Sequence, residues 1–407
     1  MSCNKLNVIL LGGQKGSDGI YAVHRNVLFS PVGKLIADAL PKKCCLTYAR
    51  QQSEPELDGI SSIVCPDDAD FTKMISTGIE GMQGDVLLLS APMPEISEQE
   101  YQMLIDQHCK TGDTVTAMTC GSQDDVWYAA LFRINQLREI LKFRPQSLTQ
   151  AVLVCGECNA TVGKYRTKEH IVVQTAMDAF CAQKNMQYQI NGAWMEQGVT
   201  IFDPTYTYIS PYARIGRGTT ILPGCMIHPE SVIGCDCTIG PNTVLHGATI
   251  GDRTKVNASQ IYESTVGKDA TVGPFAYIRP GCMIGNNTRI GDFVELKKAS
   301  IGDGTKVSHL TYVGDATVGE RVNFGCGTVV VNYDGFVKNH TVIGDDCFIG
   351  CNTNLVAPVE LGDRSLTAAG TTVTRDVPEG ALAVARVRQE NKKGWNDFRH
   401  RLHNKKD

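Results

Sequence analysis

The stretch RIGRGTTILPGCMIHPESVIGCDCTIG, residues 214–240, decides the fold of the second half of this 407-residue chain. An isoleucine returns at every sixth position: Ile215, Ile221, Ile227, Ile233 and Ile239. Neither the 3.6-residue period of a helix nor the alternation of an ordinary strand produces this repeat. A hexapeptide β-helix does, because each short strand points one aliphatic side chain into the coil. The stretch therefore predicts a parallel β-helix.

The same repeat continues towards residue 373, with occasional steps of five residues. Its later members are Leu245, Val256, Val272, Ile278, Ile284, Ile290, Leu296, Ile301, Val307, Val313, Val318, Phe324, Val330, Ile343, Ile349, Leu355, Leu361 and Val373. At about eighteen residues per three-sided coil, residues 210–375 predict roughly nine coils. Each coil is stable only when stacked on its neighbours. Five of the seven cysteines after residue 200 lie close to these aliphatic positions, and we expect them to pack as small hydrophobic side chains.

One segment interrupts the repeat. From Val330 to Ile343 the step is thirteen residues, through the stretch VNYDGFVKNH at 331–340. Seven residues are therefore extra to the coil. Such a loop either lies on the surface without a role or makes contacts that the flat face of a coil cannot make.

The first 200 residues have a different pattern. LNVILLGG (6–13) and GDVLLLS (84–90) are apolar runs of strand length, whereas SEQEYQMLIDQH (97–108) and VVQTAMDAFCAQKN (172–185) have helical spacing. Alternating strands and helices predict an α/β domain with a mainly parallel sheet. We expect its last helix to end near Gln189, and Pro204 and Pro211 to bracket the junction with the coils.

Composition excludes several classes of protein. A net charge of -4 with 20% charged residues does not indicate a nucleic-acid binder. The start of the chain resembles neither a signal peptide nor a membrane span, so we expect a cytoplasmic protein whose sixteen cysteines are reduced thiols. Cys155 and Cys158 have CxxC spacing but lack a second pair at zinc-site distance, which favours a turn with two thiols over a metal or redox site.

From about residue 193 to Trp395, the chain closely resembles the C-terminal part of the GlmU family, the bifunctional N-acetylglucosamine-1-phosphate uridylyltransferases/glucosamine-1-phosphate acetyltransferases. The resemblance is carried, in family order and spacing, by GPFAYIRPG, FVELKKASIG, SHLTYVGDA, VNFGCGT, VNYDG, LVAPV, TTVTRDVPEGALA and KKGW. It implies a left-handed parallel β-helix, a homotrimer, and active sites between neighbouring copies. It also implies transfer of acetyl from acetyl-CoA to glucosamine 1-phosphate, on the way to UDP-N-acetylglucosamine and the cell-wall peptidoglycan.

The implied reaction needs a base that titrates near neutrality, because an amine attacks a thioester only when unprotonated. His309 in SHLTYVGD matches the family's general base, and without the motif it would be taken for a surface histidine. Glu295 in FVELKK is our candidate for orienting the imidazole through its other nitrogen.

Other positions match substrate ligands of the family. Arg279 and Lys297 match its sugar-phosphate ligands, a task suited to a guanidinium and an ammonium. Tyr312 and Asn323 match sugar-binding positions. Taken alone, the two cations could belong to a solvated face and the tyrosine to the packing.

The interrupting segment matches the family's loop that reaches over the cleft beside a neighbouring subunit, where it helps to hold a long, flexible cofactor. The implied acetyl-CoA contacts are Asn332, Tyr333, Ala369 and Arg386. Cys326 and Cys351 stand near the cofactor where the family usually has alanine and serine. Both changes keep a small side chain, but replacing the serine with cysteine removes or weakens a hydroxyl hydrogen bond.

The front half departs further from the family. LLGGQKGSDGIYAVHRNVLFSPVGK (10–34) keeps a glycine-rich turn but lacks the family's GTRM arginine, and Asn26 stands where a lysine is usual. Pro92 occupies the position of a magnesium-binding aspartate and cannot bind a metal through its side chain; His170 stands at a looser match to an asparagine ligand. We therefore expect a degenerate nucleotidyltransferase-like domain, with no metal ligands and no magnesium requirement unless that domain is active.

These observations divide the chain into residues 1–200, 201–385 and a basic tail, 386–407, that we expect to be helical around Trp395 and Phe398. Two alternatives to a single-activity acetyltransferase stay open: a bifunctional enzyme and a non-catalytic trimeric scaffold. A β-helix carbonic anhydrase is a weaker alternative, since the histidines of the coils lack the close pairing of a zinc site: His228, His246, His309 and His340.

Overall fold

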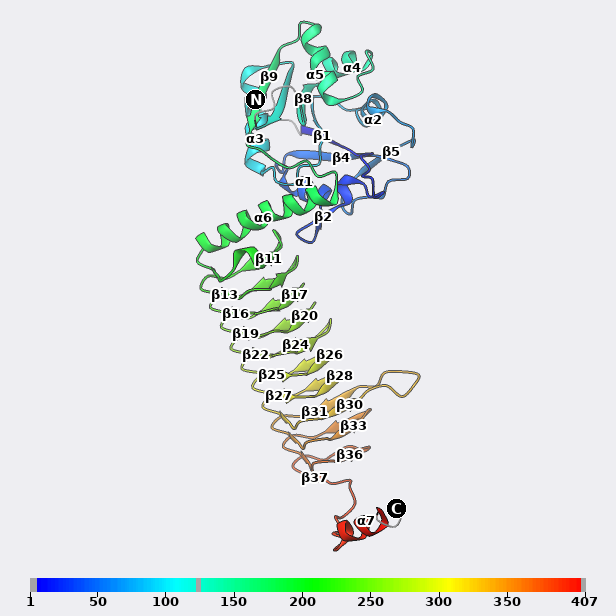
Figure 1. Ribbon diagram of the computed structural model, residues 1–407, viewed down its shortest axis with the longest axis vertical. Helices are drawn as coiled ribbons and strands as arrows, with labels where there is room; N and C mark the ends of the chain where they lie inside the picture. The colour runs from blue at the N-terminus through cyan, green and yellow to red at the C-terminus, as the bar shows by residue number, and fades with distance from the viewer. Residues whose placement is uncertain (1–5, 122–125, 404–407) are drawn as a thin grey trace. The chain divides into compact units, whose positions relative to one another are not determined.

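The computed structural model describes residues 6–121 and 126–403, and they form two compact units (Figure 1). The first unit runs to Glu196 and also contains Asp203–Ala213, while the second contains Gln197–Phe202 and continues from Arg214.

The first unit is an α/β domain built on a sheet with strand order β5-β4-β1-β6-β8-β7-β9. All neighbouring strands are parallel except that β8 runs antiparallel to β6 and β7, which confirms the predicted mainly parallel sheet. The strands of this sheet are β1 (Leu6–Leu11), β4 (Cys44–Gln51), β5 (Ser62–Cys65), β6 (Asp85–Leu89), β7 (Val115–Cys120), β8 (Ala129–Arg133) and β9 (Val162–Thr167). The unit also contains β2 (Asn26–Val27), β3 (Ser30–Pro31) and β11 (Tyr208–Ile209), which lie outside this sheet. Its helices are η1 (Ala22–His24), α1 (Val32–Ala39), α2 (Phe71–Gly78), α3 (Glu98–Thr111), α4 (Ile134–Leu141), α5 (Leu148–Glu157), α6 (Ala176–Glu196) and η2 (Pro204–Tyr206).

The helix α6 is longer than its sequence pattern predicts, since it ends at Glu196 and not near Gln189. Its last turns are held by two buried amides. The side chain of Gln187 donates to the carbonyl of Thr207 at 2.7 Å, and that of Asn191 donates to the carbonyl of Pro204 at 2.8 Å. Apolar periodicity could not reveal these contacts because polar residues make them.

The expectation that Cys155 and Cys158 lie in a turn is wrong for Cys155. Cys155 lies within α5, and Cys158 caps the C-terminal end of that helix.

A buried ionic cluster, formed by Glu95, Glu100 and His170, lies in the first unit. The His170 imidazole is 2.9 Å from Glu100 and 3.8 Å from Glu95, and its side chain is fully buried. Burial opposes ionisation of Glu100, but hydrogen bonds from Thr167, Ser97 and His170 outweigh it and lower the pKa of Glu100 to about 2. Burial likewise lowers the pKa of His170, but the two carboxylates outweigh this effect and raise it.

The second unit is a left-handed parallel β-helix, seen in Figure 1 as successive layers of short strands. One face is an eleven-stranded sheet among the described residues, formed by β10 (Thr200–Ile201), β13 (Thr220–Ile221), β16 (Thr238–Ile239), β19 (Lys255–Val256), β22 (Thr271–Val272), β25 (Arg289–Asp292), β27 (Lys306–His309), β29 (Asn323–Phe324), β32 (Phe348–Ile349), β35 (Leu366–Thr367) and β37 (Leu382–Ala383). The other strands are β12 (Arg214–Ile215), β14 (Met226–Ile227), β15 (Val232–Ile233), β17 (Val244–His246), β18 (Thr249–Ile250), β20 (Gln260–Tyr262), β21 (Thr265–Val266), β23 (Tyr277–Ile278), β24 (Met283–Ile284), β26 (Glu295–Ile301), β28 (Tyr312–Val318), β30 (Val329–Val331), β31 (Thr341–Ile343), β33 (Asn354–Val356), β34 (Val359–Leu361) and β36 (Thr372–Val373).

The predicted core of the β-helix is confirmed. Every member of the six-residue repeat is buried, and the most exposed of them, Ile215, has a relative exposure of 7%. Nine strands of the eleven-stranded face, from β13 to β35, lie within residues 210–375, as the coil length predicts. Four of the cysteines pack in this interior: Cys225, Cys237, Cys282 and Cys347.

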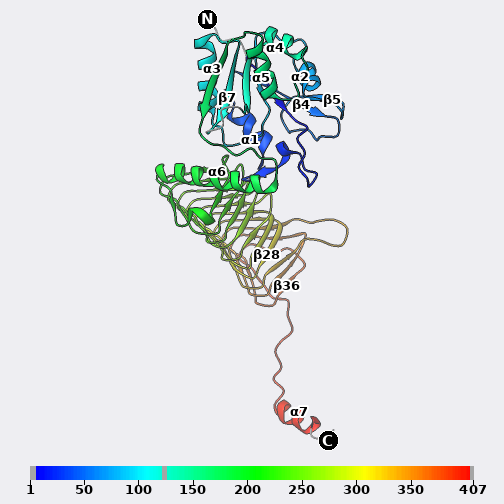
Figure 2. The same cartoon turned by 45° about the horizontal axis from the view of Figure 1, so that its top comes forward.

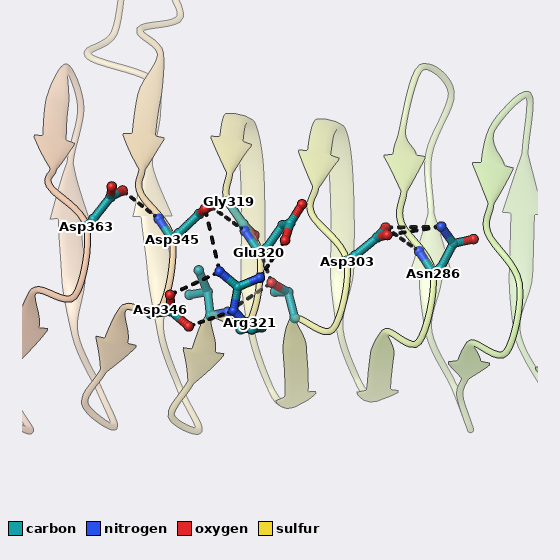
Figure 3. Close-up of polar contacts among 10 residues, drawn as sticks. Asn286, Asp303, Gly319, Glu320, Arg321, Asp345, Asp346 and Asp363 are labelled. Carbon is teal, nitrogen blue, oxygen red and sulfur yellow. Dashed lines mark hydrogen bonds and ion pairs between the residues drawn. The ribbon is translucent and has the colours of Figure 1, made fainter.

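The corners of the coils explain the recurring Gly-Asp pairs of the sequence. At Gly302, a Cβ atom would lie 2.5 Å from the carbonyl carbon and oxygen of Gly319 on the next coil, so a larger residue cannot fit without movement. The following aspartate then bonds to a neighbouring coil, as Asp303 does by accepting from the Asn286 N–H at 2.7 Å (Figure 3). Asp345 and Asp363 repeat this contact further along the stack.

The interrupting segment leaves the stack after β30 and returns at β31. Figure 2 shows it as a long loop projecting from the coils. The Asp334 carboxylate fixes its turn by accepting from the N–H groups of Phe336 and Val337. The Phe336 side chain stands out of the fold at 92% exposure, so the loop does not serve the core of its own chain.

The tail contains α7 (Trp395–His403), as its pattern predicts, and the rings of Trp395 and Phe398 lie 5.5 Å apart. Within the described ranges, 6–121 and 126–403, no helix combines the length and apolar character that crossing a bilayer requires.

The corner contacts can be tested at Asp303. Replacing Asp303 with alanine removes the acceptor for the Asn286 N–H and lowers the free energy of unfolding of the β-helix by about 1 kcal/mol. Replacing Asp303 with asparagine keeps an oxygen acceptor and lowers the free energy of unfolding by less. Urea unfolding followed by circular dichroism measures both variants, and equal losses would show that the corner bond does not stabilise the stack.

The ionic cluster predicts a pH-dependent contribution to stability. The ionised Glu100 contributes fully above its ordinary pKa of 4.5, and this contribution disappears as the pH falls to about 2. The protonated His170 contributes fully below its ordinary pKa of 6.5 and is lost as the pH rises through its raised value. Glu100→Gln therefore lowers stability most between pH 4.5 and 6.5. Unfolding of both proteins across this range checks the prediction, and a pH-independent difference would contradict it.

Candidate active site

One corner of the β-helix carries a line of chemically distinct side chains on successive coils. Asp292 and His309 are partners in the register of β25 and β27. The register continues through Val307 and Phe324, then Phe324 and Ile349, then Ile349 and Thr367. Two residues beyond Ile290, Val307, Phe324, Ile349 and Thr367 follow the residues that we call the corner column, one on each coil: Asp292, His309, Cys326, Cys351 and Ala369.

His309 is exposed and is held by a carboxylate. Its Nδ1 lies 2.6 Å from Asp292 Oδ1, and its side chain is 53% exposed. The hydrogen bond with His309 holds the pKa of Asp292 below its ordinary value. A carboxylate that accepts from Nδ1–H fixes the tautomer in which Nε2 carries the lone pair. Nε2 is then the nitrogen that can accept a proton from a substrate.

The expected role of Glu295 is wrong in this structure, because the carboxylate beside His309 belongs to Asp292. Glu295, at the start of β26, accepts instead from Arg279 Nη1 at 3.0 Å. The spacing contains the missed signal: Asp292 precedes His309 by seventeen residues, one coil, whereas Glu295 precedes it by fourteen. A residue one full coil away lies directly beside its partner, and a residue fourteen away lies around the corner.

The two predicted phosphate ligands are neighbours. Ile278 pairs with Leu296, which places Arg279 and Lys297 side by side on adjacent coils. Lys297 is nearly buried, and its Nζ lies 3.2 Å from Asp315 Oδ2. Asn332 donates to Asp315 and, at 3.4 Å, to the hydroxyl of Tyr312. The structure therefore gathers Arg279, Lys297, Tyr312 and Asn332 in one polar cluster.

Lys338 is a further cation that the sequence reading missed. It lies on the projecting loop, and the adjacent ammonium of Lys297 lowers its pKa. A lysine whose charge is opposed by neighbouring cations, here Lys297 and Arg279, gains stability when an anion binds between them. This arrangement suits a phosphate group.

The other residues predicted to contact the sugar or acetyl-CoA lie outside this polar cluster. Asn323 opens β29 three residues before Cys326 and is half-buried. Tyr333 lies at the base of the projecting loop, where its hydroxyl donates to the Gly335 carbonyl at 2.6 Å. Arg386 approaches the corner column, since a Cβ atom at Gly370 would lie 3.8 Å from its Cδ. A cation close to Ala369 suits the phosphates of coenzyme A.

The glycine-rich turn of the first unit is filled by a side chain of the same chain. Gly13 has a φ of +81°, and its N–H donates to Glu54 Oε2 at 2.8 Å. A Cβ atom at Gly12 would lie 2.2 Å from that oxygen, so the turn closes around the carboxylate. Glu54 is 1% exposed. A carboxylate therefore occupies the backbone donor that a triphosphate would need.

The other expected substitutions of the first unit have internal partners. The Pro92 carbonyl accepts from the Val173 N–H at 2.9 Å. His170 belongs to the buried ionic cluster with Glu95 and Glu100. Arg25, which the sequence analysis does not single out, is also buried and forms an ion pair with Asp18 at 2.6 Å. Among residues 6–121 and 126–403, no group of three or more His, Cys, Asp or Glu side chains could hold a metal ion.

Comparisons with known proteins agree with this architecture. Residues 232–258 match the hexapeptide repeat of succinyl-transferase, and residues 261–359 match the GMPPB C-terminal domain. Among solved structures, an Arabidopsis UDP-N-acetylglucosamine acyltransferase overlaps 44% of this chain and 69% of its own at 20% identity, with a TM-score of 0.29, too low to carry an argument.

Curated relatives extend over most of the chain. The bifunctional protein GlmU of Clostridium kluyveri is 55% identical over 78% of this chain and 79% of its own. That of Clostridium acetobutylicum is 38% identical over 91% of this chain and 88% of its own. That of Thermoanaerobacter pseudethanolicus is 41% identical over 77% and 78%, respectively. This chain belongs to the GlmU family.

Proposed function

We propose that this protein transfers the acetyl group of acetyl-CoA to the amine of glucosamine 1-phosphate, forming N-acetylglucosamine 1-phosphate for UDP-N-acetylglucosamine biosynthesis. The observation that carries the proposal is the exposed imidazole of His309, whose Nδ1 lies 2.6 Å from the Asp292 carboxylate. The relatives named bifunctional protein GlmU support the same pathway.

The geometry suggests how each group acts. His309 Nε2 takes the proton from the substrate amine, and Asp292 stabilises the imidazolium that forms. Arg279, Lys297 and Lys338 hold the sugar phosphate, so the amine is delivered to the base in a fixed orientation. Tyr312 and Asn323 are proposed to contact the sugar.

The corner column offers acetyl-CoA a surface of small side chains. Cys326, Cys351 and Ala369 follow one another on adjacent coils, so the acyl chain can lie along the corner without a steric barrier. We assign Asn332 and Tyr333 to the pantetheine end and Arg386 to the phosphates. Acetyl-CoA supplies the acetyl group as a co-substrate, and the chain's own residues supply binding and proton transfer.

A homotrimer is part of the proposal. The projecting loop exposes Phe336 and Val337 to solvent, which a soluble monomer rarely does with adjacent apolar side chains. A second copy of the chain would cover them and would complete the cofactor site.

Uridylyl transfer is the second candidate function, because the curated relatives are named as bifunctional. Three features of the first unit argue against uridylyl transfer in this chain. Glu54 occupies the Gly13 N–H, and Pro92 supplies no carboxylate for magnesium. The Arg25 guanidinium already forms an ion pair with Asp18. We therefore propose that the first unit has lost nucleotidyl transfer and that no magnesium is required.

Replacing His309 with alanine tests the central role. N-acetylation of glucosamine 1-phosphate, measured by mass spectrometry, falls about 100-fold or more because the general base is lost. His340→Ala is the matched control: this imidazole is also exposed, but it bonds to Thr317, and none of the described carboxylates pairs with it. Turnover that survives in the His309 variant would show that another group is the base.

Lys338→Ala tests the phosphate cluster. Removing this cation raises the KM for glucosamine 1-phosphate by about tenfold and leaves kcat less affected, as expected for one charged hydrogen bond. Lys268→Ala, an exposed lysine paired with Asp252 on an earlier coil, is the control. An unchanged KM would place the phosphate elsewhere.

The first unit can be tested separately. We expect no UDP-sugar and no pyrophosphate when UTP, magnesium and N-acetylglucosamine 1-phosphate are added to the protein, because Glu54 and Pro92 remove the phosphate and metal sites. A commercial bifunctional enzyme serves as the positive control. Magnesium-dependent pyrophosphate release would restore the bifunctional assignment.

A further inference from the structure

One carboxylate, that of Asp315, connects the coils to the projecting loop. Asp315 lies on β28, and its side chain is 17% exposed. Its Oδ2 atom lies 3.2 Å from Nζ of Lys297 on the adjacent coil and also accepts a hydrogen bond from the side-chain amide of Asn332. Lys297 is a proposed phosphate ligand, and Asn332 is a proposed acetyl-CoA contact. A single oxygen atom therefore joins residues assigned to the two substrates.

The two partners of Asp315 are shielded from solvent. The relative exposure of Asn332 is 6%, and that of the Lys297 side chain is 9%. Burial opposes ionisation of Asp315, but hydrogen bonds from Lys297 and Asn332 outweigh this effect and hold the pKa of Asp315 below its ordinary value. Hydrogen bonds to a charged group are stronger where little water competes for the same atoms. The carboxylate therefore fixes the positions of both side chains.

The contact with Asn332 also fixes the base of the projecting loop. The carbonyl of Asn332 accepts from the N–H of Asn339 at 2.7 Å, and a bridge pairs Tyr333 with Lys338. The two sides of the loop are thus bonded to each other close to the coils. Because Asp315 holds the first side of this base, the position of Lys338 on the second side depends on the same carboxylate.

The charged groups around Lys297 leave one positive charge in excess. The three cations of the cluster are Arg279, Lys297 and Lys338. The Arg279 guanidinium lies 3.0 Å from the Glu295 carboxylate, and Lys297 is paired with Asp315. Lys338 is the third cation, and the adjacent ammonium of Lys297 lowers its pKa. An anion that binds between Lys297 and Lys338 therefore draws the loop towards the coils, and a loop already held there binds the anion more tightly.

We propose that Asp315 is a positioning residue that couples the binding of the two substrates. It holds Lys297 for the sugar phosphate and Asn332 for acetyl-CoA, so each ligand stabilises the arrangement that binds the other. The inference rests on the proposed function, which assigns these two ligands. Coupling between two binding sites is reciprocal, so each ligand raises the affinity for the other by the same factor.

The experiment measures the Kd of the full-length protein for glucosamine 1-phosphate by isothermal titration calorimetry, without and with saturating coenzyme A. Coenzyme A replaces acetyl-CoA, so no acetyl group is transferred during the titration. We expect coenzyme A to lower this Kd about fivefold or more. In Asp315→Asn, which keeps the size of the side chain but removes its charge, we expect the two Kd values to agree within about twofold.

The backbone at this position guides the choice of variants. Asp315 has a φ of 50°, in the left-handed region that asparagine and glycine tolerate better than other residues. Asp315→Gly removes the side chain altogether and provides a second variant, in which we also expect coenzyme A to leave the Kd unchanged. Circular dichroism checks that each variant has the secondary structure of the unsubstituted protein.

Glu295→Gln is the matched control. Glu295 holds Arg279, the other proposed phosphate ligand, but among the residues that the structure describes its bonded partner lies on the coils and not on the loop. We expect this variant to keep the response to coenzyme A, whatever its own affinity for the sugar phosphate. Asp252→Asn, which alters the ion pair with Lys268 on an earlier coil, also keeps the response.

The outcomes separate this inference from the proposed function. Folded Asp315 variants that keep the response to coenzyme A overturn the inference. Unsubstituted protein that acetylates the sugar, but whose Kd does not respond to coenzyme A, also overturns it. Loss of the response in Glu295→Gln as well would assign the coupling to the charge of the cluster and not to the bridge at Asp315. If the unsubstituted protein neither binds nor acetylates glucosamine 1-phosphate, the proposed function fails first.

Discussion

The structure depends on the stacking of coils in strict register. Each coil is too thin to hold a core of its own, so its aliphatic side chains must lie directly beside those of the coils before and after it. The six-residue repeat supplies these side chains, and the glycines at the corners allow the backbones to approach, as at Gly302. A shift of one residue anywhere would turn buried side chains outward, and the carboxylates that bond between coils, such as Asp303, oppose such a shift.

The same register builds the proposed active site from residues that are distant in sequence. One coil of seventeen residues separates Asp292 from His309, and one more separates His309 from Cys326. A proton acceptor and its orienting carboxylate therefore need no special loop. The loop serves a different purpose: it leaves the stack between β30 and β31 and brings Lys338 beside Lys297. The rigid coils position the imidazole and its carboxylate, and the projecting loop adds a positive charge that the flat face of the coils lacks.

Much of this could be predicted from the sequence because the repeat is so regular. Burial of the repeat from Ile215 to Val373 followed from spacing alone. The hydrogen-bond partner of His309 could not be predicted from spacing alone. Choosing between Asp292 and Glu295 required the length of the coil at that corner, not proximity in sequence. Lys338 was missed because nothing in the repeat describes how an interruption folds. The filling of the glycine-rich turn by Glu54 depends on a contact across forty-one residues of an irregular domain, which no periodicity encodes.

The central claim is that acetyl transfer takes place at the corner column beside His309. An experimental structure of the protein with coenzyme A and glucosamine 1-phosphate tests it most directly. The account predicts that the coenzyme sulfur lies against Cys326 and that the sugar nitrogen lies within hydrogen-bonding reach of His309 Nε2, with the phosphate held by Arg279 and Lys297. Coenzyme A bound on another face of the coils, with His309 open to solvent and touching neither ligand, would contradict it.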